Sequence, residues 1–305
     1  MINKIYKMIY TLGESLMDII TTHDGLTIAK PGGSMLNVSV SLGRAGKEVS
    51  LISEIGDDET GSELIGFLHE NAISTDFVTI YENNQTSKAL ALLDENSKPS
   101  YTFQKAYPNT RWLAKPPAFT ENDILVLGSM YSRDPEIEDD LDAYLTAAKR
   151  GGALIVYDPN VRHNHQLKNE TSREMLLKNL AFAHIIKGSD EDFSNIFNTD
   201  SIQKIKEEVF RIKQNALLII TLGADGCIAF INERMFKKPA LKTHVISTIG
   251  AGDAFTAGLV NAFIDQEAND HLKLSDVGIE SMLAEASQFS SLVCQSMDNY
   301  IPVRK

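Results

Sequence analysis

The sequence predicts an α/β fold with a mainly parallel central sheet and a small β-sheet lid. Short apolar runs alternate with helical patterns along most of the chain, and two hairpin-like segments break this alternation. No internal repeat or low-complexity linker divides the 305 residues. A chain of this length can bury one large core, so we expect residues 1–305 to form one domain, with lid segments at about 15–30 and 86–105 inserted into it.

The central sheet is expected from short runs of mainly apolar residues. The candidate strands are Met8–Leu12, Val49–Ile55, Ile124–Leu127, Ala153–Tyr157, His184–Ile186, Leu217–Thr221 and Cys227–Ile231. The candidate helices between and after them are Met35–Ala45, Gly61–Asn71, Ile137–Lys149, Ser172–Phe182, Ile202–Lys213, Asp253–Ile264 and Ser281–Cys294. Ligands of such folds gather at the carboxyl ends of the strands, so the glycine-rich and polar turns that follow these runs are expected to share one rim.

The lid is expected from two segments with a strand-like pattern. Ser15–Lys30 carries a turn at Asp24-Gly25, and Ser87–Leu93 and Ser100–Gln104 flank a turn at residues 94–97. Small strands inserted into an α/β domain favour a lid over the ligand rim. The alternatives are a hairpin without a functional role and a homodimer contact through its exposed edge.

Composition narrows the class of protein. The net charge of −12 and the pI of about 5.1 argue against a nucleic-acid or anionic-membrane partner. Cys227 and Cys294 are the two cysteines, so we expect no disulfide framework and a reducing, cytoplasmic location. The first residues resemble no signal peptide, and no apolar run approaches the ~18 residues that would suggest a membrane span.

The most informative stretch is Gly250-Ala251-Gly252-Asp253. It lies between Val245–Thr248, which we expect to end a strand, and an apolar helix that begins at about Ala254. Two glycines allow the backbone to approach a ligand closely, and the amides of a helix start can bind an anion. Asp253 can accept the proton of a hydroxyl beside that anion, which is the equipment for moving a phosphoryl group onto an alcohol. The alternative is a glycine-rich helix start whose Asp253 complements the helix dipole.

Three motifs in order carry a resemblance to a known family. They are Thr248–Phe255, Pro31–Gly46 and Ile55–Gly61. With the lid hairpin between them, they resemble the ribokinase-like (pfkB) family of carbohydrate kinases, and most closely its fructokinase-like branch, over Gly13 to Ile301. The resemblance implies a Rossmann-type sandwich with a β-sheet lid and ATP-dependent phosphorylation of a primary hydroxyl of a small sugar.

The resemblance assigns the same catalytic roles to the glycine-rich stretch. Asp253 would be the base toward the acceptor hydroxyl. The amides of Gly250, Ala251, Gly252 and Asp253 would form the anion hole for the transferred group.

The sugar is expected to contact the two N-terminal motifs. The stretch from Gly13 to Asp18 resembles the first strand and lid start of fructokinase-like members, and a carboxylate at Asp18 accepts strong hydrogen bonds from adjacent hydroxyls. Gly32 and Gly33 would give backbone access to the sugar, and Asn37 offers a donor and an acceptor. The alternatives are a solvated turn acid at Asp18 and a solvated or capping role for Asn37. Ser34 is expected to cap the helix that follows it.

Three further residues complete the expected sugar site. Tyr101 and Phe103 have strand spacing and would share one face of the lid, either over the sugar or packed within the lid itself. Arg162 follows Asp158-Pro159-Asn160-Val161 and matches an arginine of the fructokinase and ketodeoxygluconate kinase branches. Its fork would hold a phosphate or a carboxylate, or form a salt bridge to neighbouring acids. No metal is assigned to the nearby histidines.

The nucleotide is expected along the later strands. Lys187 opens a stretch in which Ser189 and Asp192 replace the Asn-x-x-Glu of the family, so Mg²⁺ is expected with ATP through bound water and not through an assigned ligand. The alternative is that Ser189 caps a helix.

Two other segments are assigned to the nucleotide by the resemblance. The stretch Thr221-Leu222-Gly223-Ala224-Asp225-Gly226 resembles the nucleotide-side loop, with a plain strand-to-strand turn as the alternative. Ser287 falls near the expected adenine.

Ser247 stands where many relatives carry an aspartate beside a monovalent-cation site, so potassium activation is not expected. These expectations describe a sugar kinase with ATP, Mg²⁺ and a sugar, most closely a fructokinase. A 2-keto-3-deoxygluconate kinase and a catalytically silent sugar- or nucleotide-binding relative stay open. A dinucleotide dehydrogenase is disfavoured because no Gly-x-Gly-x-x-Gly follows the first strand.

Overall fold

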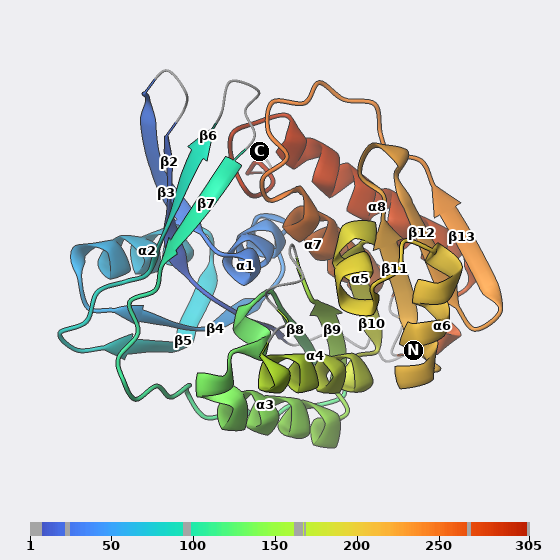
Figure 1. Ribbon diagram of the computed structural model, residues 1–305, viewed down its shortest axis with the longest axis horizontal. Helices are drawn as coiled ribbons and strands as arrows, with labels where there is room; N and C mark the ends of the chain where they lie inside the picture. Colours follow the sequence, from blue (N-terminus) through green and yellow to red (C-terminus); the bar gives the residue numbers. More distant parts are fainter. Residues whose placement is uncertain are drawn as a thin grey trace.

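The computed structural model describes residues 8–21, 25–93, 99–161, 167, 169–266 and 270–303, with the side chains of residues 93 and 99–101 excepted. A nine-stranded sheet runs through the molecule in the order β13-β12-β11-β10-β9-β8-β1-β4-β5 (Figure 1). Its strands are β1 (Ile9–Leu12), β4 (Val49–Gly56), β5 (Ile73–Tyr81), β8 (Ile124–Gly128), β9 (Leu154–Asp158), β10 (Ile185–Ser189), β11 (Leu217–Thr221), β12 (Cys227–Ile231) and β13 (Arg234–Lys238). From β5 to β11 neighbouring strands are parallel, and β12 and β13 pair antiparallel at one end. The predicted α/β class with a mainly parallel sheet is therefore confirmed.

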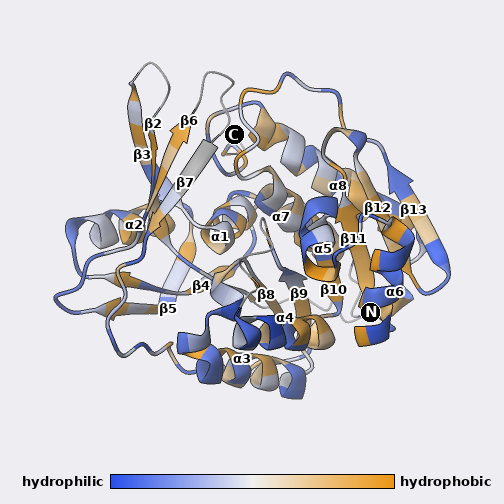
Figure 2. Ribbon diagram, in the orientation of Figure 1, coloured by the Kyte–Doolittle hydropathy of each residue, from blue (hydrophilic) through white to orange (hydrophobic). Residues whose placement is uncertain are grey.

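Helices cover both faces of this sheet. The helices are α1 (Ser34–Arg44), α2 (Glu59–Glu70), α3 (Glu138–Gly151), α4 (Glu170–Phe182), α5 (Asp190–Phe197), α6 (Ile202–Ile212), α7 (Ala251–Asp265) and α8 (Asp276–Cys294). One apolar core lies between the sheet and α1, α2, α7 and α8, and a second lies between the sheet and α3 to α6. Because β8 and β9 are buried on both faces, their sequences are nearly continuous apolar runs, which Figure 2 shows as hydrophobic strands at the centre.

The lid is a separate four-stranded sheet in the order β3-β2-β6-β7. It is formed by β2 (Leu16–Thr21), β3 (Thr27–Gly32), β6 (Lys88–Leu93) and β7 (Pro99–Gln104). Each of the two predicted segments therefore supplies two of the four strands. β2 pairs parallel with β6, and this pairing joins the two segments into one sheet. The predicted turn at Asp24-Gly25 lies partly outside the described residues, and the one at residues 94–97 lies wholly outside them.

The prediction missed two strands, one α-helix and the short 3-10 helices. β5 and β13 are edge strands whose polar and charged side chains obscure the apolar alternation. α5 is a short helix that directly follows β10. Most other boundaries agree to within two residues, but α8 begins five residues before the predicted Ser281, at Asp276.

The strand expected at Val245–Thr248 is wrong. Residues 239–249 contain neither helix nor strand, and Val245 and Ile246 are 54% and 49% exposed. The amides of Ile246 and Ser247 both donate to the carbonyl of Cys294 at the end of α8. The segment therefore lies on the surface against a helix end, without a neighbouring strand to pair with.

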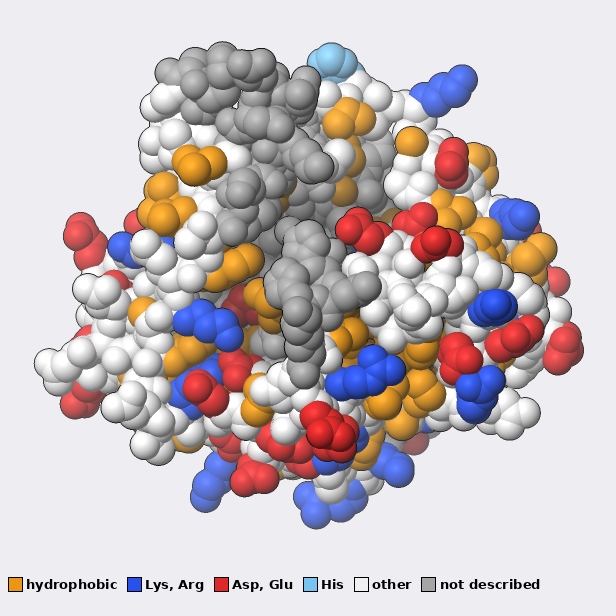
Figure 3. All heavy atoms as spheres, in the orientation of Figure 1, with side chains coloured by type: hydrophobic (Ala, Val, Ile, Leu, Met, Phe, Trp, Pro, Cys, Tyr) orange, Lys and Arg blue, Asp and Glu red, His pale blue; other side chains and the backbone are white. Residues whose placement is uncertain are grey.

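Charged side chains of both signs are spread over the visible surface (Figure 3). On the face shown in Figure 3, acidic and basic side chains intermingle instead of separating into fields of one sign. Among the described residues, no helix combines the length and the apolar character that crossing a membrane requires.

Candidate active site

The first turn of α7 forms the centre of the candidate site. Gly250 precedes α7 in the left-handed conformation, with φ of 79°, and a Cβ there would lie 2.3 Å from the carbonyl oxygen of Asn299. Only glycine fits this position without strain. The amide of Ala251 donates to the carbonyl of Thr248, and helix geometry gives the other first-turn amides no intrahelical acceptor. The turn thus has the form of an anion-binding helix start.

Asp253 faces the first turn of α1. The hydroxyl of Ser34 donates to Asp253 Oδ1 at 2.6 Å, and the side-chain amide of Asn37 donates to Oδ2 at 2.8 Å. Ser34 and Asn37 are 8% and 4% exposed. Each carboxylate oxygen therefore has a fixed orientation, and a carboxylate held in this way can receive a proton from a hydroxyl placed beside it.

The predicted cap at Ser34 is wrong. Gly33 occupies the N-cap position without a side-chain hydrogen bond, and α1 begins at Ser34. The Ser34 hydroxyl is directed to Asp253 because the close approach of α7 offers it a charged acceptor.

Asp18 and the two glycines pack together at the root of the lid. Asp18 is 8% exposed, and its Oδ2 accepts a hydrogen bond of 2.9 Å from the side-chain amide of Asn299. A Cβ at Gly32 would lie 2.1 Å from Asp18 Oδ2, and one at Gly33 would lie 2.2 Å from the carbonyl oxygen of Glu14. Both positions therefore need glycine for close packing. This packing role is separate from the predicted role of giving the sugar access to the backbone.

Among the other predicted sugar residues, Phe103 is placed on the same face of the lid as Asp18. Phe103 lies opposite Ala89 in the register of β6 and β7, and Ala89 lies opposite Asp18 in that of β2 and β6. The Phe103 side chain is 45% exposed. Tyr101 belongs to β7, but its side chain lies outside the described residues, as does the whole of Arg162.

Lys187 lies beneath the first turn of α7. Its ammonium donates to the carboxylate of Asp158 at 2.8 Å and to the carbonyl of Gly252 at 3.2 Å, and Thr256 Oγ1 also donates to Asp158. Burial raises the pKa of Asp158, although the Lys187 ammonium opposes this. Burial would lower the pKa of Lys187, but the carboxylate of Asp158 outweighs it and the pKa is raised. The ion pair holds α7 on β9 and β10, so the structure gives Lys187 a supporting position under the anion turn.

Ser189 and Asp192 form a capping box at the start of α5. The Ser189 hydroxyl accepts from the amide of Asp192 at 3.0 Å, and Asp192 Oδ2 accepts from the amide of Ser189 at 2.7 Å. The capping alternative is therefore realised. The two residues lie at the carboxyl end of β10, where Asp192 is 7% exposed.

Thr221 lies next to Ser189 because β10 and β11 pair in register at these residues. After Thr221, Gly223 and Gly226 turn the chain into β12 with φ of 55° and 96°, and the amide of Leu222 donates to the carbonyl of Gly226. The structure thus brings the predicted nucleotide loop to the same rim as Ser189, and the loop is also a strand-to-strand turn. Ser287 is placed inside α8, where its hydroxyl donates to the carbonyl of Leu283.

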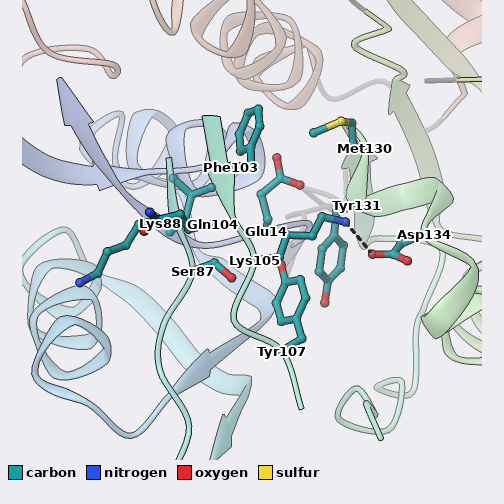
Figure 4. Close-up of a pocket in the computed structure, with 11 residues that line it drawn as sticks. Glu14, Ser87, Lys88, Phe103, Gln104, Lys105, Tyr107, Met130, Tyr131 and Asp134 are labelled. Carbon is teal, nitrogen blue, oxygen red and sulfur yellow. Dashed lines mark hydrogen bonds and ion pairs between the residues drawn. The ribbon is translucent and has the colours of Figure 1, made fainter. Parts of the chain in front are cut away.

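A pocket at the root of the lid was not predicted (Figure 4). It is lined by Glu14, Leu16, Ser87, Lys88, Phe103, Gln104, Lys105, Tyr107, Met130, Tyr131 and Asp134. Glu14 and Ser129 follow the neighbouring strands β1 and β8, and the Ser129 hydroxyl donates to the Glu14 carboxylate at 2.5 Å. The signal that could have identified these two residues is that polar side chains follow two adjacent parallel strands.

A buried charge network supports one wall of this pocket. Arg111 forms ion pairs with Glu54 and with Asp134, and its guanidinium lies 3.9 Å from the centre of the Tyr107 ring. Tyr131 donates to Glu54 at 2.6 Å, and burial raises the pKa of Tyr131 well above its ordinary value. No pattern in the sequence pairs Arg111 with Glu54, which lies 57 residues earlier.

A mainly parallel sheet with a separate lid, and a glycine-rich helix start that carries an acid in its first turn, are typical of kinases of the ribokinase-like fold. The model of the pfkB family of carbohydrate kinases matches residues 8–305, and the chain belongs to this family. It is therefore a sugar kinase that uses ATP. It is 28% identical over 267 residues to a fructokinase of Klebsiella pneumoniae, with 87% of each chain covered. It is 27% identical over 285 residues to the probable fructokinase-4 of Arabidopsis thaliana, with 88% of this chain and 87% of the relative covered.

Solved structures support the fold. The fructokinase of Vibrio cholerae O395, determined with fructose, ADP and calcium ion, superposes with a TM-score of 0.86 at 20% identity over 96% of this chain and 94% of the other. The uncharacterized sugar kinase PH1459 of Pyrococcus horikoshii superposes with a TM-score of 0.77 at 25% identity over 96% and 94%. The predicted family and fold are thus confirmed.

Proposed function

We propose that this chain is a fructokinase that transfers the γ-phosphoryl group of ATP to a primary hydroxyl of fructose. The observation that carries the proposal is the contact of Asp253 with Ser34 and Asn37, because it joins the anion-binding turn to the predicted sugar motif. The similar fructokinases support the choice of sugar. Asp18 supports it too, because a carboxylate suits a neutral sugar rich in hydroxyls and would repel a sugar acid.

In the proposed reaction the sugar lies under the lid between Asp18 and Asn37. Asp253 orients the primary hydroxyl and accepts its proton as the hydroxyl oxygen bonds to the γ-phosphorus. The bond from that phosphorus to the bridging oxygen breaks, and ADP leaves with the electron pair. The first-turn amides of Gly250, Gly252 and Asp253 stabilise the charge on the transferred group, whereas the amide of Ala251 donates to Thr248. Holding both substrates in reacting positions supplies the remaining rate enhancement.

Mg²⁺ is proposed to enter with the phosphates of ATP. Among the described residues, no group of three or more histidine, cysteine, aspartate or glutamate side chains could hold a metal ion. An Mg²⁺ ion that enters with the nucleotide keeps most of its waters. Asp192, at the rim end of β10, would hold such a water, and the bound ion would neutralise charge on the phosphates.

A homodimer through the lid is part of the proposal. The lid exposes four large apolar side chains, which are Leu26, Ile28, Leu92 and Phe103. Leu92 lies on the face of the lid opposite to Phe103, and an exposed apolar side chain on this outer face favours burial against a second copy. Analytical ultracentrifugation can compare the oligomeric state of the wild type with that of Leu92→Glu, which should favour the monomer. A wild-type protein that is monomeric at micromolar concentration contradicts the proposed dimer.

The decisive experiment measures ATP consumption over a panel of sugars and sugar acids, with Asp253→Asn as the inactive control. We expect D-fructose to give the highest kcat/KM. The second candidate is 2-keto-3-deoxygluconate, which Arg162 would favour. Arg162→Lys would then raise the KM for that acid far more than the KM for fructose. If no compound of the panel drives ATP consumption above that of the control, both the fructokinase and the 2-keto-3-deoxygluconate kinase assignments are contradicted. That result would favour a sugar- or nucleotide-binding protein.

A further inference from the structure

The last described part of the chain passes between the lid root and the start of α7. Figure 1 shows this C-terminal part beside the lid strands and α7. It includes Met297–Ile301, none of which belongs to a helix or strand. The segment follows α8 and is short, yet it contacts four elements of the candidate site, which are β2, β3, α1 and the start of α7.

Asn299 makes two of these contacts. Its side chain is fully buried, and Nδ2 donates to Asp18 Oδ2 at 2.9 Å. Its backbone packs against Gly250, because a Cβ on that glycine would lie within 2.3–2.7 Å of the carbonyl group and Cα of Asn299. Asn299 thus contacts both Asp18, the carboxylate predicted to bind the sugar, and Gly250, the glycine that shapes the anion turn. Within the described part of the chain, Asn299 Oδ1 has no hydrogen-bond partner, so the side chain is held by its Nδ2 donor.

The segment is anchored on both sides of Asn299. Before it, the ammonium of Lys30 in β3 donates to the carbonyl of Met297. Burial lowers the pKa of Lys30, and the carboxylates of Asp18 and Asp298 oppose that shift. After it, Arg44 Nη1 donates to the carbonyl of Ile301 at 2.8 Å, and the Arg44 guanidinium lies 4.6 Å from the centre of the Tyr300 ring. Lid strand β3 and helix α1 therefore hold the two ends in place.

We propose that Asn299 is a positioning residue that fixes the Asp18 carboxylate for the sugar and couples it to the Gly250 turn. The inference rests on the proposed function, since it assumes that Asp18 contacts the sugar. One carboxylate oxygen of Asp18 is restrained by Asn299, which sets the direction of the other. The buried backbone of the same residue transmits movement of the lid root to the anion turn, because packed interiors do not deform freely.

The test compares two isosteric substitutions. Asn299→Asp replaces the donor with an acceptor that faces Asp18. The matched control is Asn261→Asp, because Asn261 is also a buried amide, at 3% exposure, and donates to the Glu285 carboxylate between α7 and α8. We expect Asn299→Asp to raise the KM for the sugar substrate by about 10- to 100-fold, as for loss of a hydrogen bond to a charged group. The KM for ATP should change by less than about twofold, and the control should change neither KM.

Hydrogen exchange supplies a readout independent of turnover. In Asn299→Asp, amides of β2 and of residues 250–255 should both lose protection, whereas in Asn261→Asp they should not. The reversed pair, Asp18→Asn with Asn299→Asp, recreates a donor and an acceptor. It should recover the protection without recovering the sugar KM. If Asn299→Asp does not fold, Arg44→Met, which loosens the far end of the segment, should show the same loss of protection.

The two proposals fail in different ways. A wild-type protein that phosphorylates no sugar contradicts the proposed function. Unchanged exchange in β2 and residues 250–255 of Asn299→Asp, or an equal change in Asn261→Asp, contradicts the role of Asn299 whatever the turnover. A sugar KM that stays within about twofold of wild type, well below the loss expected for a charged hydrogen bond, contradicts it as well.

Discussion

Asn37 donates a 2.8 Å hydrogen bond to Asp253 across a separation of 216 residues. This contact places the first turn of α1 against the first turn of α7. The N-terminal and C-terminal motifs of the sequence therefore form one site, with the candidate base held between two donors.

Asp253→Asn is expected to lower kcat by about 10²–10⁴, the contribution of a general base. The fold and the affinity for ATP should remain close to those of the wild type, because the new side chain has the same shape. Asp265→Asn, at the exposed end of the same helix, is the control and should retain full activity. Steady-state kinetics with a separate ATP-binding measurement checks this. More than about a tenth of the wild-type kcat in Asp253→Asn would rule out the assigned role.

Lys187→Met is expected to lower the free energy of unfolding by about 3–5 kcal/mol, because it leaves the Asp158 carboxylate buried without its charged partner. The two side chains are 5% and 3% exposed, so solvent screens the pair very little. Chemical denaturation measures the loss. The double variant with Asp158→Leu should regain much of it, since an apolar pair carries no buried charge. A single-variant loss under about 1 kcal/mol would mean that the pair does not hold α7 in place.

Stability is expected to fall as the pH decreases from about 6.5 toward 4, the interval between the pKa values of unfolded and folded His184. Burial lowers the pKa of His184 to about 4, and it also lowers that of the neighbouring His271. The unfolded chain therefore binds protons first as the solution is acidified. Chemical denaturation between pH 7 and 5 should show that the free energy of unfolding depends less steeply on pH in His184→Asn than in the wild type. Exposed His69→Asn serves as control, and equal slopes in all three proteins would refute the prediction.

Potassium is expected to have little specific effect on the rate. Ser247 is neutral, and its hydroxyl accepts a hydrogen bond of 3.2 Å from the amide of Ile249, so it is a weak cation ligand. Rates in potassium and in a bulky organic cation should agree at equal ionic strength. Ser247→Asp should introduce a dependence on potassium. Strong selective activation of the wild type would count against this interpretation of Ser247.

The lid is expected to gain protection when the sugar binds, since closure excludes the water that would compete for the phosphoryl group. Hydrogen exchange over β6 and β7, with and without fructose, measures this. Helix α3, on the opposite side of the molecule, is the internal control and should not change. Unaltered exchange in both lid strands would limit the lid to a structural or dimer-forming role.

The sequence by itself determined the parallel sheet, the lid strands and the glycine-rich start of α7, because each depends on a local pattern. Apolar runs predict strands buried on both faces, as in β8 and β9. Two glycines before an apolar helix predict close approach of the backbone and an anion-binding helix start, which α7 has. The edge strands β5 and β13 were missed because their polar side chains conceal the pattern, and the run at Val245–Thr248 was mistaken for a strand because an apolar run does not reveal whether a partner strand exists.

Only the tertiary structure decided which polar groups meet. The pairs Ser34–Asp253, Asn299–Asp18, Lys187–Asp158 and Arg111–Glu54 each join segments far apart in the chain. Hydrogen bonds and ion pairs act over a few ångströms, so the folded arrangement of the elements selects the partners and local sequence does not. The same arrangement turned Ser34 from an expected helix cap into a donor to Asp253.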